Sequence, residues 1–79
     1  MNTKWISVKD RETLPNADKK ESFFSVDILM TIENKEDKSK RVAVGYLAYE
    51  QNEWVEYGST LDEMERVTAW MPLPEPWNG

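Results

Sequence analysis

The chain of 79 residues has neither cysteine nor histidine, and it contains only three glycines. Without cysteine there is no disulfide, and a closed zinc site is not expected because carboxylates alone rarely build one. The same two absences remove the usual general base and the thiol nucleophile of enzymes. Three glycines, one of them terminal, provide no glycine-rich loop for phosphate. We therefore expect a protein without a metal site, a cofactor or catalytic residues.

Paired carboxylates are the one catalytic arrangement that these absences leave open, as acid and base of a hydrolase. The candidate pairs are Asp62 with Glu63 and Glu53 with Glu56. Both pairs lie in polar stretches, where solvated side chains are expected. A carboxylate hydrolase therefore ranks third among the possible functions, after two binding functions.

Long apolar runs are also absent. No run approaches the roughly 18 residues that a membrane-spanning helix needs, and no basic-then-apolar leader opens the chain. We expect a cytoplasmic protein without membrane contact, and the lack of cysteine fits a reducing compartment. At this length we expect one domain, residues 1–79. Its small core favours large side chains or a homo-oligomer.

Basic residues are scarce in the second part of the chain. Residues 1–49 carry nine Lys or Arg against eight Asp or Glu, whereas residues 50–79 carry Arg66 alone against seven acids. This distribution, within a net charge of −5, argues against nucleic-acid binding, which needs a basic surface. It permits docking on a basic protein surface, although solubility by itself also explains an acidic surface.

Alternating apolar residues predict the first long strand over residues 23–32. Successive side chains of a strand point to opposite faces. One face of this segment is wholly apolar and should be buried, whereas the other is mixed. The residues of the apolar face are Phe24, Val26, Ile28, Met30 and Ile32.

Two further strands are predicted after a charged loop at residues 33–40. Residues 41–49 are apolar on both faces, which indicates an interior strand. Gly45 within it marks a bulge or a close approach by another side chain, such as an indole. A short polar turn then leads into residues 54–57, which complete a hairpin.

The two ends of the chain contain shorter signals. Residues 4–8 can add an edge strand, and residues 9–22 form a loop in which Leu14 is the one inward anchor. The last strand begins at Val67 and must end at Pro72, because proline has no amide proton to donate to a ladder.

A short helix is predicted before the last strand. Thr60 followed by Glu63 has the spacing of a capping box, so one helical turn is expected over residues 61–65, with Leu61 and Met64 facing inward. The predicted fold class is α+β, mostly β. It is a small antiparallel meander sheet of four to five strands with one short helix before the last strand.

The two ends together resemble the family called domain of unknown function 551, small proteins found mostly in phages, prophages and bacteria. Its motif opens with Trp-Ile-x-Val, a basic residue and Leu-Pro, and closes on Val/Ile-Thr-His-Trp-Met-Pro-Leu-Pro-x-Pro. The corresponding segments here are Trp5–Val8, Arg11, Leu14-Pro15 and Val67–Pro76. The resemblance covers nearly the whole chain.

Two departures from this motif matter. Ala69 stands where the family usually has histidine, and Glu12-Thr13 lengthens the segment before Leu14. A chemistry that depended on the histidine would not be available to this chain. The family has no assigned activity, so the resemblance implies a shape more than a role.

Aromatic residues are the best candidates for binding. Four tryptophans are too many for a small core to bury completely, and each indole N–H needs a partner. Trp5 and Trp70 either form a site or, in the plainer interpretation that we favour, pack against each other and hold the two ends together. Trp77, beyond the prolines, is the freest for contact, and Trp54 is the remaining tryptophan.

Two binding functions remain open. The first is a non-enzymatic, phage- or prophage-type accessory protein that binds a host macromolecule. The second is sequestration of a small nucleotide-like signal, for which Arg11 could hold a phosphate unless it pairs with Asp10 or another carboxylate. The candidate binding residues are Trp5, Arg11, Trp54, Trp70 and Trp77.

Overall fold

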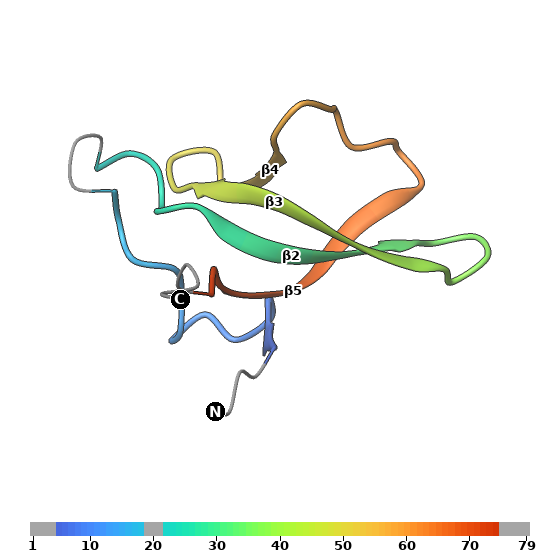
Figure 1. The fold of residues 1–79 in the computed structure, drawn as a ribbon, viewed down its shortest axis with the longest axis horizontal. Coiled ribbons are helices and arrows are strands. Elements are labelled where there is room, and N and C mark those ends of the chain that lie inside the picture. The colour runs from blue at the N-terminus through green and yellow to red at the C-terminus, as the bar shows by residue number, and fades with distance from the viewer. Residues whose placement is uncertain (1–4, 19–21, 75–79) are drawn as a thin grey trace, which may run out of the picture.

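The computed structural model describes residues 5–18 and 22–74, which form one antiparallel sheet of five strands (Figure 1). The strands are β1 (Ile6–Ser7), β2 (Ile28–Asn34), β3 (Lys40–Ala48), β4 (Glu53–Glu56) and β5 (Glu65–Pro72). The predicted mostly-β class, antiparallel pairing and upper strand number are confirmed. The end of β5 at Pro72 also agrees with the prediction.

The order of the strands across the sheet differs from a simple meander. It is β1-β5-β2-β3-β4, so only β2, β3 and β4 pair in sequence order. In Figure 1 the chain arches from β4 across to the start of β5, which pairs antiparallel with β2. The last strand therefore lies between β1 and β2 and makes β2 the central strand.

The core lies on one face of β2, as the alternation predicted. Ile28, Met30 and Ile32 are almost completely buried, and they pack with Val67 and Trp70 of β5. In the ladder Met30 is opposite Trp70 and Ile32 is opposite Val67. Burying one such side chain stabilises the fold by about 2 kcal/mol, so the β2–β5 contact carries much of the stability.

The first long strand starts later than predicted. Val26 is 38% exposed, and its N–H donates to the carbonyl of Asn16 rather than to a sheet strand. The backbone of Phe24 joins the sheet through an isolated bridge to Ala48, and its ring lies against Tyr46 of β3. Ser25 interrupts the ladder with β3, because its side-chain hydroxyl accepts the N–H of Leu47 in the place of a backbone carbonyl. The prediction that Phe24 and Val26 share the buried face is therefore wrong.

Ser25 is 3% exposed, and its hydroxyl links two backbone groups. Oγ accepts a hydrogen bond from the N–H of Leu47 (2.8 Å) and donates one to the carbonyl of Val26 (2.8 Å). Ser25→Ala should lower the free energy of unfolding by about 2 kcal/mol, because a buried backbone donor loses its partner. Urea unfolding measures the loss. Ser22→Ala, at an exposed position, is the control, and equal stability of the two variants would contradict the prediction.

Gly45 confirms the predicted close approach but not its partner. A Cβ added there would lie 2.0 Å from the carbonyl oxygen of Val55 and 2.5 Å from Cε of Met30. The neighbours are thus a backbone of β4 and a core methionine, and no indole is among them. The irregularity in the sheet lies elsewhere, between Thr31 and Ile32 where β2 pairs with β5.

No helix forms among the described residues, so the helix predicted over residues 61–65 is wrong. The capping interactions exist, but they begin at Asp62 instead of Thr60. Asp62 Oδ1 accepts from the N–H of Met64 (3.0 Å), and Glu65 Oε1 accepts from the N–H of Asp62 (3.1 Å). Glu65 is already the first residue of β5, which leaves no room for a helical turn. Leu61 packs against the core as predicted, whereas Met64 is exposed.

Arg41 on β3 joins two other strands through charged hydrogen bonds. Its guanidinium makes two bonds to Glu56 of β4 (2.7 and 2.8 Å), and Nε bonds Glu65 of β5 (3.0 Å). These bonds hold the pKa values of both carboxyl groups below the ordinary 4.5. A carboxyl with a lowered pKa in the folded state stabilises the fold above its unfolded pKa, and this stabilisation is lost as the pH falls through the folded value.

Arg41→Met should therefore destabilise the protein at neutral pH and matter progressively less in acid. We expect the gap in urea midpoint between wild type and variant to be full above about pH 5 and to narrow below pH 4.5. Equilibrium unfolding at a series of pH values measures this gap. A gap that stays constant down to about pH 3 would contradict the assignment of the lowered pKa values to Arg41.

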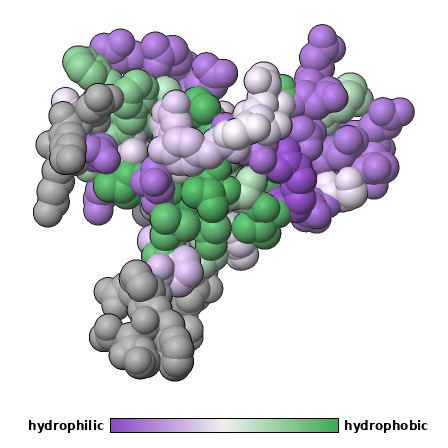
Figure 2. Space-filling model, turned by 45° about the horizontal axis from the view of Figure 1, so that its top comes forward, coloured by the Kyte–Doolittle hydropathy of each residue, from purple (hydrophilic) through white to green (hydrophobic). Residues whose placement is uncertain are grey.

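The face of the sheet opposite the core is open. Val42 of β3 is 59% exposed, and Val44 beside it is also exposed. An aromatic row crosses this region, with Tyr46 in contact with both Phe24 (ring centroids 5.4 Å apart) and Tyr57 (5.2 Å). Figure 2 shows hydrophobic residues gathered at the centre of the face in view, with hydrophilic residues along its upper and right-hand margins. The described residues thus form a single sheet in which one face carries the buried core and the opposite face is exposed to solvent.

Candidate functional site

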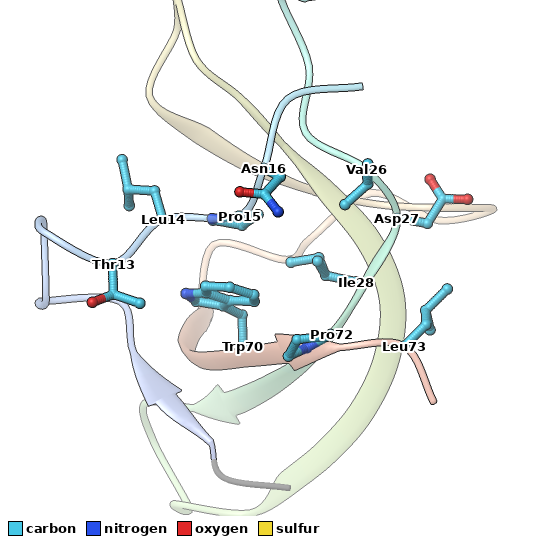
Figure 3. A pocket seen from close by; sticks show the side chains of 10 residues that line it. All are labelled: Thr13, Leu14, Pro15, Asn16, Val26, Asp27, Ile28, Trp70, Pro72 and Leu73. Carbon is cyan, nitrogen blue, oxygen red and sulfur yellow. The ribbon is translucent and has the colours of Figure 1, made fainter. Parts of the chain in front are cut away.

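A pocket of about 400 Å³ lies where the N-terminal segment meets the end of β5 (Figure 3). Its walls come from residues 13–16, residues 26–28, Trp70, Pro72 and Leu73. The two segments singled out at the ends of the sequence, Leu14-Pro15 and the stretch around Trp70, thus meet at one place. A volume of this size is in the range of sites that hold a small molecule or a peptide side chain.

The N-terminal segment is held over the pocket by backbone contacts. β1 pairs with β5, with Ile6 opposite Trp70, and the N–H of Val8 donates to the carbonyl of Thr68 (3.1 Å). Further along, the hydroxyl of Tyr49 donates to the carbonyl of Pro15. Pro15 is buried, so this segment forms a fixed wall and the pocket is preformed in the sheet domain.

Trp70 contributes a polar group without a partner among the described residues to the wall of the pocket. Its side chain is 5% exposed, and its indole Nε1 has no hydrogen-bond partner among the described residues. Figure 3 shows the ring at the base of the pocket with its nitrogen on the side of Thr13. A buried donor without a partner costs about 1–3 kcal/mol. Nε1 itself has almost no accessible surface, so an acceptor brought in by a ligand would recover this energy only when the side chains next to the indole nitrogen move aside.

Asp27 lies at the other end of the pocket, near Leu73 (Figure 3). Its Oδ1 accepts a hydrogen bond from the hydroxyl of Tyr57 (2.6 Å). This bond, helped by burial and by the negative charge of Asp27, raises the pKa of Tyr57 to about 12. The contact ties the loop after β4 to the segment that precedes β2, and it fixes the carboxylate at the pocket rim.

Asp27→Asn should lower the pKa of Tyr57 from about 12 part of the way toward its ordinary value of 10.0, because a hydrogen bond to a neutral amide oxygen is weaker than one to a carboxylate and the negative charge is gone. The raised pKa stabilises the folded protein up to about pH 10, and that contribution disappears as the pH rises to about 12. Titration of the ultraviolet absorbance of tyrosinate measures the shift. Glu36→Gln in the β2–β3 turn is the control, and an unchanged curve for Asp27→Asn would contradict the assignment.

The chemistry of the lining is simple. Most of its surface comes from aliphatic, proline and indole side chains, and among the described residues Asp27 is the only ionisable one that lines it. None of these lining residues is basic, and no cluster of three or more acids gathers anywhere in residues 5–18 and 22–74 in a way that could hold a metal ion. The pocket can therefore hold an apolar group that offers a hydrogen-bond acceptor.

Of the predicted binding residues that the structure describes, only Trp70 lines this pocket. Trp5 is 43% exposed, and the residue opposite Trp70 is Ile6, so the two ends are held together without the predicted Trp5–Trp70 packing. Trp54 packs against the core and lines a second pocket of about 140 Å³. Trp77 lies outside the described residues.

Arg11 is also separate from this site. Its Nη2 donates to Oδ1 of Asn52 in the β3–β4 turn (2.7 Å), and it does not line the pocket. The predicted pairing with Asp10 is not the contact that forms. Arg11 is thus placed to support the N-terminal segment, and none of the described lining residues offers a cation to a phosphate.

Several pocket residues carry no strong signal in the sequence, among them Thr13, Asn16 and Asp27. Asp27 alone had a detectable one, since it is the single charged residue within residues 23–32. A charge in an otherwise apolar strand segment is unusual enough to mark a rim or a site. The others come together only through the pairing of distant segments.

These features define a class of small, five-stranded antiparallel sheet domain whose two ends meet at an apolar pocket. The chain belongs to the family described as Protein of unknown function (DUF551), whose model matches residues 4–78. The resemblance found in the sequence is thus confirmed. None of the curated proteins matches the chain, and neither does any solved structure. In the described part of the chain no helix is long and apolar enough to cross a membrane.

Proposed function

We propose that the protein is a non-enzymatic accessory protein, of the phage or prophage type, that binds a host protein. Binding takes place when an extended segment of the partner enters the Trp70 pocket. The observation that carries this proposal is the indole N–H of Trp70, which is buried at the base of an apolar pocket without a partner among the described residues. A backbone carbonyl of the partner is the acceptor it fits.

The edge of the pocket favours an extended ligand over a compact one. Val26 and Leu73 line the pocket and are also 38% and 40% exposed, so its apolar wall continues onto the surface. A peptide segment can cover such a wall on both sides of the side chain that it inserts. Tryptophan in a preformed pocket is a frequent centre of binding energy in protein interfaces.

Catalysis has little support from the arrangement of acids. Asp27 is the only acid among the described residues that line the pocket, and the hydroxyl of Tyr57 is bonded to it. The candidate acids of β4 lie in another place, and Glu56 among them is bonded to Arg41. A hydrolase needs two carboxylates on either side of a substrate, so we propose a binding role.

A small molecule is the second candidate, because a volume of about 400 Å³ could enclose one. The lining argues against a nucleotide, since phosphate groups need cations or several N–H donors and none of the described lining residues is basic. A neutral molecule with a carbonyl or ether oxygen would fit better.

Trp70→Phe should reduce capture of the partner protein at least about tenfold, because it keeps an aromatic ring and removes the N–H donor. The measurement is quantitative affinity capture from the producing cell, compared with Trp54→Phe, which changes a tryptophan outside this pocket. Circular dichroism shows that both variants are folded.

Two results would contradict this proposal. One is equal capture by wild type and Trp70→Phe. The other is release of a small molecule, in a one-to-one ratio, when wild-type protein from the producing cell is denatured, which would favour the second candidate.

Self-association and a cytoplasmic location, which for a phage protein is the host cytoplasm, are part of the same proposal. Exposed Val42 and Val44 on the open face are compatible with contact between copies. Sedimentation velocity over a hundredfold range of concentration measures the association. A single monomeric species throughout that range would remove it from the proposal.

A further inference from the structure

We infer that the Trp70 pocket selects a segment in which an apolar residue is flanked by a lysine or arginine. This inference rests on the proposed function and adds the chemistry of the partner. Three features of the site define the segment: a donor at one end, an apolar middle and a carboxylate at the other end.

The donor and the middle define the inserted residue. The side chains of Pro15, Ile28 and Pro72 border the space beside the indole ring and are apolar, and the amide of Asn16 lies next to Pro15 (Figure 3). A proline or aliphatic side chain therefore fits the middle. The N–H of Trp70 requires an acceptor next to it, and a backbone carbonyl is the acceptor that every peptide carries.

The carboxylate defines the flanking residue. Asp27 is exposed at the rim, and the hydrogen bond from Tyr57 falls on Oδ1. Because this hydrogen bond holds the Asp27 side chain in place, it also sets the position of the second carboxylate oxygen, Oδ2. Since none of the described lining residues is basic and the whole chain carries a charge of −5, a cation on the segment is attracted and an anion is repelled.

The two polar ends lie on opposite sides of the pocket. Figure 3 shows the indole nitrogen on the side of Thr13 and Asp27 on the far side, next to Leu73. A ligand must therefore place its acceptor and its cation at two ends of one apolar group. The positions of these two groups do not fix the direction in which a peptide binds. A test peptide should therefore carry a charged residue on both sides of its apolar residue.

The probes are three capped peptides that differ only in charge: Ac-Lys-Pro-Leu-Pro-Lys-NH2, its glutamine twin and its glutamate twin. Proline keeps each of them extended at little entropic cost. Binding is followed on the full-length, ¹⁵N-labelled protein by the indole N–H signal of Trp70. The sequence has four tryptophans, and the signal that disappears in Trp70→Phe identifies the right one.

We expect weak binding, with a Kd on the order of 1 mM for the lysine peptide. The glutamine twin should bind about threefold and the glutamate twin about tenfold more weakly, the range of solvent-exposed charge pairs. Asp27→Asn should reduce the tenfold preference to about threefold, because only the general charge of the protein remains. Glu36→Gln removes the same charge at the far turn and should leave the preference unchanged.

The possible failures are distinguishable. If the three peptides shift the Trp70 signal with equal Kd, or if Asp27→Asn keeps the full preference, the inference about the cation is wrong while the pocket still binds peptides. If none of the peptides shifts the signal at concentrations well above about 1 mM, the proposed function itself is overturned. Well-dispersed spectra of each variant show in the same experiment that it is folded.

Discussion

Gly45→Ala should lower the free energy of unfolding by about 3 kcal/mol, at the upper end of what overpacking costs. The added methyl group would lie 2.0 Å from the carbonyl oxygen of Val55. This oxygen belongs to the backbone of β4 and cannot move without opening the ladder, in which Gly45 is opposite Glu56. The expected change is therefore loss of β4 from the sheet together with a lower urea midpoint.

Gly58→Ala is the matched control for this prediction. Gly58 has a positive φ of 75°, but a Cβ added there would meet nothing within 4 Å. Its replacement should cost only about 1 kcal/mol, from backbone conformation alone. If the two variants are equally stable, the close contact at Gly45 does not determine its identity, and the pairing of β3 with β4 as described is wrong.

Met30→Ala should cost about 3–4 kcal/mol, which for a domain of this size is a large part of the total stability. Met30 is completely buried at the centre of the central strand, with Trp70 opposite it on one side and Ala43 on the other. Removing the side chain leaves a cavity beneath the sheet that the neighbouring strands cannot close without breaking register. Equilibrium unfolding in urea measures the loss.

Met64→Ala is the control, since Met64 is exposed in the segment before β5. Its replacement should change the stability by less than about 0.5 kcal/mol. A combined Gly45→Ala and Met30→Ala variant adds a sharper test. It removes one of the two contacts of the new methyl group but not the one with Val55, so it should be less stable than either single variant. If the double variant is more stable than Gly45→Ala, the contact with Met30 alone explains why position 45 is a glycine.

The core was predictable from the sequence because it depends on a local pattern. Ile28, Met30 and Ile32 lie on one face of the strand, whereas the other face, with Asp27 and Thr31, is mixed, so the pattern indicates which face is buried. The start of that strand was not predictable, since Ser25 replaces a ladder contact with its own hydroxyl. A hydroxyl in an alternating segment looks the same whether it faces solvent or bonds a distant backbone.

The helix and the strand order were mispredicted for a related reason. The acids before β5 accept backbone N–H groups in a turn as they would in a helix, and the entry of Glu65 into the sheet favours the turn. Neighbouring strands usually pair in order, but β5 pairs with β2 because its buried residues, Val67 and Trp70, match the core face. Such matching is a property of the assembled sheet and has no local signature.

In the candidate site, too, one residue could be identified from the sequence, whereas others are brought to it only by the fold. Trp70 could be named as a candidate from its type and from its place in the closing motif, and it lines the pocket. Asp27 and Asn16 join it only because the N-terminal segment lies across the sheet, with the N–H of Val26 bonded to the carbonyl of Asn16 (2.8 Å). Contacts between segments so far apart along the chain cannot be found from spacing alone.

The position of β5 has a consequence for synthesis. Because β5, which pairs along one edge of the central strand β2, is made after the other four strands, β2, β3 and β4 can pair before residues 65–72 join the sheet. During that interval the apolar side of β2 has no cover, and the nascent hairpins are open to association with one another. This exposure ends when β5 inserts between β1 and β2.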